Sequence, residues 1–342
     1  MRVLVTGGAG VLGQVVTRRL LAEDHEVVSV DIRQLPPTGA LATVGDVRDR
    51  ALVERLVDGA DAVVHCAAAL PSHRPEEIWA TDVNGTEVLL ELARRARVGR
   101  FVHISSTAVY GLPRDLPTPE SNPREVVDPY NRAKIEAELL CERYRERGMC
   151  VPVLRPKTFL GPGRLGIFAM LFEWAVEGRN FPLLGGGHVR CQMLDVEDLC
   201  DVVMRTLTAP RSTVDDTFNV AATEFGTLRN DFQAVLDAAG HGGRVIQVPG
   251  RPVVAALRLL EVLRLSPVYK RLAKKLLHDS YVCTAKARDA LNFAPRYSNT
   301  ASILRTFDWY RENAKSLARR GVGRAHDEIW RQGALRLAKS LF

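Results

Sequence analysis

The stretch that decides the fold of this chain is Thr6-Gly7-Gly8-Ala9-Gly10-Val11-Leu12-Gly13. It follows a short apolar run, Val3-Leu4-Val5, and opens a helical pattern that continues to Ala22. A buried strand, a glycine-rich turn and a helix in this order predict the beginning of a βαβ unit.

The same rhythm continues through the first half of the sequence. The pattern predicts strands at Arg2–Thr6, Glu26–Asp31, Ala62–His65, Arg100–Ser105 and Val151–Arg155. It predicts helices at Gly10–Ala22, Asp49–Val57, Trp79–Arg97 and Pro129–Arg147. Strands that alternate with helices of this length favour an α/β fold with a doubly wound parallel sheet, the Rossmann arrangement.

The rhythm breaks near Gly161, where glycine and proline become frequent. We therefore expect a Rossmann domain over 1–156 plus about 190–223, which the strand Thr217–Val220 rejoins, and a smaller mixed α/β substrate domain over about 157–189 plus 224–310. Residues 311–342 are expected to form a basic amphipathic C-terminal helix or tail.

The glycines of the opening stretch have mechanical roles in a site for a dinucleotide. Gly7 permits the tight turn, Gly10 lets the backbone approach a pyrophosphate, and Gly13 allows the helix to pack closely on the strand. The anion then lies on the free N–H groups of the first helical turn, which includes Val11 and Leu12.

An acidic residue, Asp31, ends the second predicted strand 18 residues after Gly13. Its carboxylate can accept hydrogen bonds from ribose hydroxyls and would repel a 2′-phosphate, so NAD is preferred over NADP. Arg33, two residues further on, keeps NADP as the less favoured cofactor because it could bind that phosphate.

A second motif, Tyr130-Asn131-Arg132-Ala133-Lys134, follows Pro129. Residues four apart on a helix share a face, so Tyr130 and Lys134 can point at one ligand. A phenol is a poor base at neutral pH because its pKa is near 10. A neighbouring ammonium stabilises the phenolate and lowers that value, which makes the pair suited to proton transfer.

Bulk properties exclude several other classes of protein. The net charge is 47 − 40 = +7, and much of the excess lies in the C-terminal tail without a nucleic-acid-binding motif, so no nucleic-acid partner is expected. Six scattered cysteines form no C-x-x-C pair, which predicts neither a metal site nor disulfides. The sequence has no apolar run long enough for a transmembrane helix and no secretory signal, so we expect a cytoplasmic protein.

The glycine spacing T-G-x-x-G-x-x-G resembles that of extended short-chain dehydrogenases/reductases, the NAD-dependent epimerase/dehydratase family, over roughly residues 1–310. Further landmarks are similar to segments that contact the cofactor in that family. The resemblance implies cofactor contacts for Asp46 and Val47 near the adenine, Ala67 and Ala68 beside the phosphates and the nicotinamide ribose, and Asn84 near the central sheet. It also implies that Lys134 holds the nicotinamide ribose.

The resemblance also supplies a third catalytic group and a reaction. Matching Val109-Tyr110-Gly111 to the family places the catalytic hydroxyl at Ser106. The implied reaction is the oxidation of a secondary alcohol: Tyr130 removes the hydroxyl proton, Ser106 polarises the oxygen, and the hydride passes to the nicotinamide.

Sugar-nucleotide 4,6-dehydratases of this family would carry carboxyls directly after the catalytic hydroxyl, where this chain has Thr107 and Ala108. We therefore expect a nucleotide-sugar 4-epimerase that works through a transient ketone, with Thr107, Thr158 and Arg190 as substrate contacts. Two features depart from the epimerase pattern: Thr158 replaces the usual Asn, and Arg190 lies one residue further from Val196 than the diphosphate-binding Arg normally does.

Two alternatives remain open. The apolar stretch Pro252–Leu265, followed by Lys270-Arg271 and Lys274-Lys275, would suit a dehydrogenase of a hydrophobic or lipid-like alcohol, similar to 3β-hydroxysteroid dehydrogenases, with peripheral membrane contact. The other alternative is a non-catalytic NAD(H)-binding protein. Analogy with the family suggests a homodimer through Trp79–Arg97 and Pro129–Arg147.

Overall fold

The computed structural model describes residues 1–113, 115–166, 168–249, 277–320, 322–323 and 329–330. The chain divides into two units. The first comprises Met1–Lys157, Val196–Ala221 and Val282–Pro295, and the second comprises Thr158–Asp195, Ala222–Tyr281 and Arg296–Phe342.

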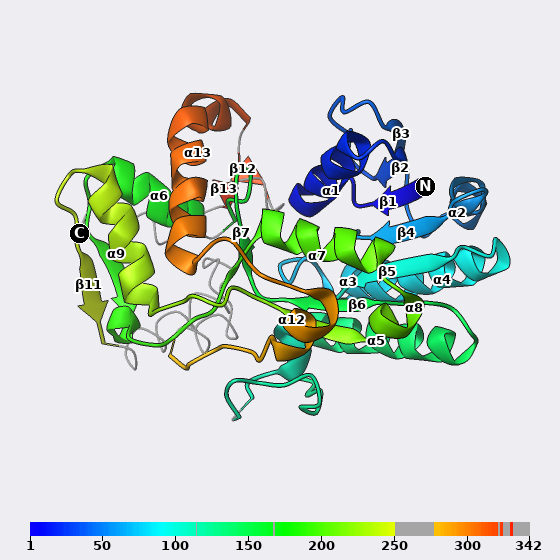
Figure 1. The fold of residues 1–342 in the computed structure, drawn as a ribbon. Coiled ribbons are helices and arrows are strands. Elements are labelled where there is room, and N and C mark those ends of the chain that lie inside the picture. The colour runs from blue at the N-terminus through cyan, green and yellow to red at the C-terminus, as the bar shows by residue number, and fades with distance from the viewer. Residues whose placement is uncertain (114, 167, 250–276, 321, 324–328, 331–342) are drawn as a thin grey trace. The chain divides into compact units, whose positions relative to one another are not determined.

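The first unit is built on a parallel sheet of seven strands in the order β10-β6-β5-β4-β1-β2-β3 (Figure 1). The strands are β1 Arg2–Thr6, β2 Glu26–Asp31, β3 Leu41–Val44, β4 Ala62–His65, β5 Arg100–Ile104, β6 Val153–Pro156 and β10 Thr217–Val220. The order runs outward in both directions from β1 and β4, which confirms the predicted doubly wound sheet. Central strands such as β4 are buried along their whole length because helices cover both faces.

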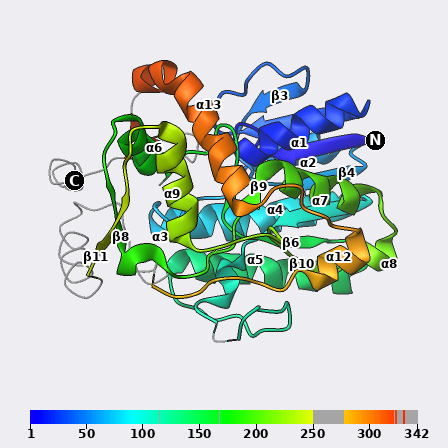
Figure 2. The same cartoon turned by 60° about the vertical axis from the view of Figure 1, so that its left-hand side comes forward.

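Helices cover the sheet in two sets (Figure 2). One set pairs α1 Val11–Ala22 with α7 Val196–Thr208, and the other packs α4 Thr86–Arg95 between α2 Arg50–Val57 and α5 Pro129–Glu146. The shorter elements of this unit are α3 Pro75–Trp79, the π-helical turn η1 Ala80–Gly85, the 3₁₀ turn η2 Thr107–Tyr110, α8 Arg211–Val214 and α12 Ala285–Leu291.

The second unit is a smaller mixed α/β arrangement. Its strands pair in parallel as β7 Phe159–Leu160 with β9 Leu194–Asp195, β8 Phe181–Leu184 with β11 Val245–Val248, and β12 Val322–Gly323 with β13 Ile329–Trp330. Its helices are α6 Phe168–Val176, the 3₁₀ turn η3 Gly185–Gly187, α9 Leu228–Ala239 and α13 Asn299–Arg320. Aromatic side chains fill its core, including Phe172, which lies 5.5 Å from Phe307 between ring centroids, and Trp174, which meets Phe181 at the same distance.

A C-terminal helix or tail was expected over residues 311–342. Residues 311–320 instead continue α13, which begins at Asn299. The apolar stretch Pro252–Leu265, the basic pairs that follow it, and residues 331–342 lie outside the described residues. Within the described part, no helix combines the length and the apolar character needed to span a bilayer.

Candidate active site

The glycine-rich turn joins β1 to α1 and lies directly on the end of β4. Gly7 has a φ of +69°, and a Cβ atom added to it would lie 2.6 Å from the backbone nitrogen of Ala67. A Cβ atom on Gly13 would lie 2.2 Å from the carbonyl oxygen of Gly7. Both positions therefore require glycine, one for its conformation and close approach and the other for the packing of α1 on the turn.

The first turn of α1 offers N–H groups to an anion. Gly10 is the N-cap residue and has no side chain that could cap these groups, while its own N–H donates to the carbonyl oxygen of Gly7 at 2.9 Å. Val11 and Leu12 are buried, so the predicted contacts at these two positions can come only from the backbone. The helix dipole adds partial positive charge at this point, which suits a pyrophosphate.

Asp31 lies at the carboxyl end of β2 with its carboxylate turned toward the glycine-rich turn. One oxygen accepts from the N–H of Ala9 at 3.0 Å and the other from the N–H of Arg33 at 2.9 Å. A carboxylate has about four acceptor positions, so capacity for ribose hydroxyls remains. The Arg33 guanidinium donates to the carbonyl oxygen of Ala9 at 2.9 Å, which places it at the same turn.

The remaining predicted cofactor contacts differ in burial. Asp46 is partly buried and pairs with Arg48 at 2.5 Å, and the hydrogen bond from Arg48 lowers the pKa of that carboxyl. Val47 is buried and Ala68 is exposed. Asn84 is exposed, whereas Asp82, two residues earlier on η1, is fully buried.

Tyr130 and Lys134 lie on the first turns of α5, which begins at a defined cap. Asp128 is the N-cap residue, and its carboxylate accepts from the N–H of Asn131 at 2.7 Å. Lys134 Nζ lies 5.8 Å from the centre of the Tyr130 ring, and the lysine is only 3% exposed. The two groups therefore face the same side of the helix, as the spacing predicts.

Sequence reasoning missed the residue that partners Lys134. Asp82 Oδ2 lies 3.3 Å from Lys134 Nζ, and both side chains are buried. Burial raises the pKa of Asp82, with Lys134 opposing that rise. The available signal was position: Asp82 lies four residues after Ile78 and four before Thr86, and both of these are buried.

Ser106 follows β5 and is tied to the start of α5. Its hydroxyl caps η2 by accepting from the N–H of Ala108 at 3.1 Å. The buried side chain of Asn131 donates to the carbonyl oxygen of Ala108 at 2.6 Å, and its oxygen accepts from the N–H of Val127 at 2.9 Å. Asn131 thus fixes the Ser106 turn against the helix that carries Tyr130. Thr107 is buried, and its hydroxyl donates to the carbonyl oxygen of Pro156 at 3.4 Å.

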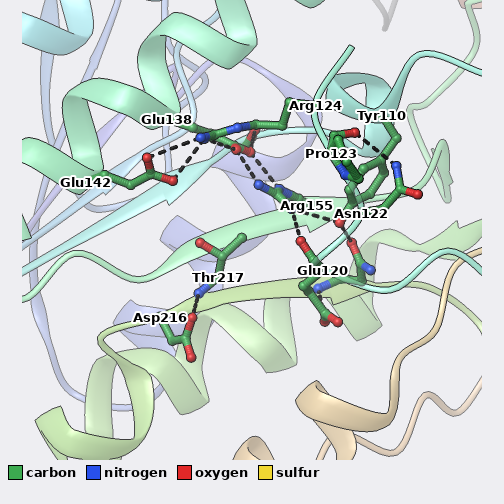
Figure 3. Close-up of polar contacts among 12 residues, drawn as sticks. Tyr110, Glu120, Asn122, Pro123, Arg124, Glu138, Glu142, Arg155, Asp216 and Thr217 are labelled. Carbon is green, nitrogen blue, oxygen red and sulfur yellow. Dashed lines mark hydrogen bonds and ion pairs between the residues drawn. The ribbon is translucent and has the colours of Figure 1, made fainter. Parts of the chain in front are cut away.

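A buried ionic network holds α5 on the sheet one turn beyond Lys134 (Figure 3). Glu138 accepts from Arg155 at 2.6 Å and 2.9 Å, from Arg124 at 3.3 Å and from the hydroxyl of Ser105 at 2.5 Å. Because Ser105 precedes Ser106, this network links α5 to the end of β5. The Arg155 guanidinium also donates to the hydroxyl of Tyr110 at 2.8 Å.

Two predicted substrate contacts belong to the second unit. Thr158 is exposed and its carbonyl oxygen accepts from the N–H of Leu194. The Arg190 guanidinium lies over the rings of Phe225 and Tyr281, at 4.8 Å and 4.9 Å from their centres. No cluster of three His, Cys, Asp or Glu side chains suited to a metal occurs within the described residues.

A doubly wound sheet with a glycine-rich turn at the start of α1 and a Tyr–Lys pair on α5 is the arrangement expected of a dinucleotide-dependent oxidoreductase. Residues 3–221 match the model of the NAD-dependent epimerase/dehydratase family. The chain belongs to this family of enzymes, and its cofactor is NAD.

Named relatives support this assignment over nearly the whole chain. A dTDP-glucose 4,6-dehydratase from Streptomyces niveus is 31% identical and covers 92% of this chain and 94% of the relative. A UDP-glucose 4-epimerase from Mycolicibacterium smegmatis is 27% identical, with coverage of 92% and 100%. The solved structure of a dTDP-glucose 4,6-dehydratase from Streptomyces venezuelae, with NAD bound, is 27% identical and superimposes with a TM-score of 0.74 over 92% of this chain and 98% of that one.

Proposed function

We propose that this enzyme is a nucleotide-sugar 4-epimerase that acts through a transient ketone. The observation that carries the proposal is the Tyr130–Lys134 pair on α5, held beside the Ser106 turn by Asn131. Relatives named as UDP-glucose 4-epimerase and dTDP-glucose 4,6-dehydratase support a nucleotide sugar as the substrate.

Each of the three residues has a distinct task. Tyr130 takes the proton of the sugar hydroxyl and later returns it, and Ser106 donates a hydrogen bond to the same oxygen. Lys134 stabilises the phenolate and binds the nicotinamide ribose. Asp31 and the glycine-rich turn hold the adenosine end of the cofactor. NAD held by these residues would supply the acceptor, and then the donor, of the hydride.

Epimerisation is favoured over dehydration by the two residues after Ser106. Elimination of water from the sugar needs an acid and a base at the neighbouring carbons. Thr107 is buried and directed at the carbonyl oxygen of Pro156, and Ala108 carries no ionisable group. These positions therefore supply no carboxyl, and return of the hydride to the opposite face of the ketone remains the favoured outcome.

Substitution of Tyr130 by Phe tests the catalytic assignment. We expect turnover of UDP-, GDP- or dTDP-hexoses to fall by about 100-fold or more, because general acid–base transfer is lost. NAD binding, measured by calorimetry, should be retained. Tyr144→Phe on the same helix is the matched control and should leave turnover unchanged, since Tyr144 packs in the hydrophobic core. A Tyr130→Phe variant that turns over normally contradicts the proposal.

The outcome of the reaction can be read from the substrate itself. A hexose deuterated at C4 should give the C4 epimer with its deuterium retained and without net reduction of added NAD. Release of NADH with a steroid alcohol, and no response to any nucleotide sugar, would instead support the hydroxysteroid dehydrogenase alternative.

A homodimer and a cytoplasmic location complete the proposal. The dimer would form through the outer faces of α4 and α5. Sedimentation equilibrium tests the homodimer, and a monomeric protein at the concentrations used in the assay contradicts it.

A further inference from the structure

The catalytic lysine has a carboxylate as its buried neighbour. Asp82 Oδ2 lies 3.3 Å from Lys134 Nζ, with side-chain exposures of 0% and 4%. A lysine ammonium has three donors, so an ion pair with one carboxylate oxygen leaves donors for the nicotinamide ribose and the phenolate.

Asp82 is itself held in a fixed position. Its Oδ1 accepts from the N–H of Ala69 at 2.6 Å, in the segment that follows β4. Its carbonyl oxygen accepts from the hydroxyl of Thr86 at 2.6 Å. It lies on the π-helical turn η1, and such turns are frequent at functional sites. The carboxylate therefore joins the β4 end of the cofactor site to Lys134.

We propose that Asp82 is a positioning residue for Lys134, and that its charge sets the pH range over which the Tyr130–Lys134 pair is active. The inference rests on the proposed oxidoreductase chemistry. Asp82 acts on the position and protonation of the Lys134 ammonium and does not itself contact the substrate.

The other ionisable groups around this pair leave Asp82 as the determining charge. Tyr130 and Glu138 act electrostatically on Lys134, and His73 acts on Asp82. Lys134 in turn acts on His65, Cys66 and His103. Burial lowers the pKa of His65 to about 3 and raises that of Cys66 to about 12, so both are neutral at physiological pH. Burial also lowers the pKa of His103 well below its usual value.

The second carboxylate, Glu138, is already committed to two arginines. It pairs with Arg155 at 2.6 Å and with Arg124 at 3.3 Å. Burial acts to lower the pKa of Lys134, but the charges of Asp82 and Tyr130 outweigh it and the net change is upward. Asp82 is thus the largest charge that offsets the effect of burial on the pKa of Lys134.

Asp82→Asn tests the charge with little change in shape, because the amide oxygen can still accept from Ala69. Without the carboxylate, Lys134 should lose its proton at lower pH, so the alkaline limb of the kcat profile should move down by about one pH unit. The acidic limb should also move down, since the field of the ammonium on the Tyr130 phenol is no longer opposed. Asp58→Asn, an exposed substitution at the end of α2, is the matched control and should move neither limb.

A measurement without substrate separates this inference from the proposed function. The ionisation of the Tyr130 phenol can be followed by ultraviolet difference titration of the NAD complex against Tyr130→Phe. In Asp82→Asn the phenol should ionise at lower pH than in the wild type, whether or not any nucleotide sugar is turned over. A folded, NAD-binding Asp82→Asn protein with unshifted phenol ionisation and unshifted limbs overturns the inference.

Asp82→Glu covers the case in which the neutral variant fails to fold. It keeps the charge but lengthens the side chain by one methylene, so kcat should fall while both limbs and the phenol ionisation stay in place. Shifted limbs with an unchanged kcat would contradict a positioning role that acts through charge.

Discussion

Removal of the Glu138 carboxylate should destabilise the first unit strongly. Glu138 is 1% exposed and accepts hydrogen bonds from Arg155, Arg124 and Ser105 (Figure 3). In Glu138→Ala the Arg155 guanidinium stays buried, with the Tyr110 hydroxyl and a backbone carbonyl as its remaining partners. Breaking a buried pair in this way costs about 3–5 kcal/mol, because one charge is left uncompensated.

The loss of stability in Glu138→Ala should come mainly from the Arg155 charge that remains buried without its carboxylate partner. Glu138→Leu combined with Arg155→Met removes both charges, so most of the loss in the free energy of unfolding should be recovered. Urea unfolding monitored by circular dichroism, with NAD binding as a second probe of this unit, measures both variants. Because α5 carries Tyr130 and Lys134, NAD binding should be lost along with the structure of this unit.

A surface pair provides the control. Arg19 and Glu23 form an exposed contact at 2.6 Å on and just beyond α1. Glu23→Ala should cost less than about 1 kcal/mol, as is usual for exposed pairs. The reasoning is refuted if Glu138→Ala costs no more than this surface substitution, or if the double variant is no more stable than Glu138→Ala.

Two further predictions concern the cofactor end of the site. Gly13→Ala should abolish NAD binding, because the added Cβ would lie 2.2 Å from the carbonyl oxygen of Gly7. Gly226→Ala is the control: the nearest atom to its added Cβ is a side-chain nitrogen at 3.7 Å, so it should bind NAD normally in calorimetry. Burial lowers the pKa of His65 to about 3, so the unfolded chain binds a proton below about pH 6.5 that the folded chain does not. The stability of the wild type relative to His65→Gln should therefore fall by about 2 kcal/mol between pH 7 and pH 5, and equal urea midpoint shifts in both proteins would argue against this.

Much of the fold of the first unit can be predicted because its central strands are buried on both faces. Such strands read as continuous apolar runs, and β1, β2 and β4 have the predicted boundaries. The edge strand β3 was not predicted, because it is open on one side and keeps Leu41 and Val44 exposed. Its short sequence therefore lacks the apolar run that marks its neighbours.

The site is predictable where it depends on local spacing and not where it depends on tertiary packing. Tyr130 and Lys134 share a helix, so their spacing sets their common face. The buried partner of Lys134 comes from η1, inside a segment that was expected to form one regular helix over Trp79–Arg97. The spacing of four from Ile78 and from Thr86 places Asp82 on the buried face of that helix. No local spacing shows that Lys134, from a different helix, packs against it.

A chain of buried hydrogen bonds links the glycine-rich turn to the residue that holds Lys134. His65 lies between the hydroxyls of Thr6 and Thr86, at 2.7 Å from Nδ1 and 3.0 Å from Nε2. The Thr86 hydroxyl donates to the carbonyl oxygen of Asp82, so it must accept from Nε2–H of His65.

The hydrogen bond at Nδ1 of His65 is fixed by the position of the proton on Nε2. With its proton on Nε2, the neutral ring accepts at Nδ1 from Thr6, whose oxygen also accepts from the N–H of Ala67 at 3.3 Å. A second proton on the ring would put two donors against the Thr6 oxygen and leave the Thr6 hydroxyl without its acceptor. The neutral state that burial imposes on His65 is thus the state that connects β1, β4 and Asp82. Protonation of His65 in acid should therefore disturb the glycine-rich turn and Asp82 together, because the His65 ring is hydrogen-bonded toward both.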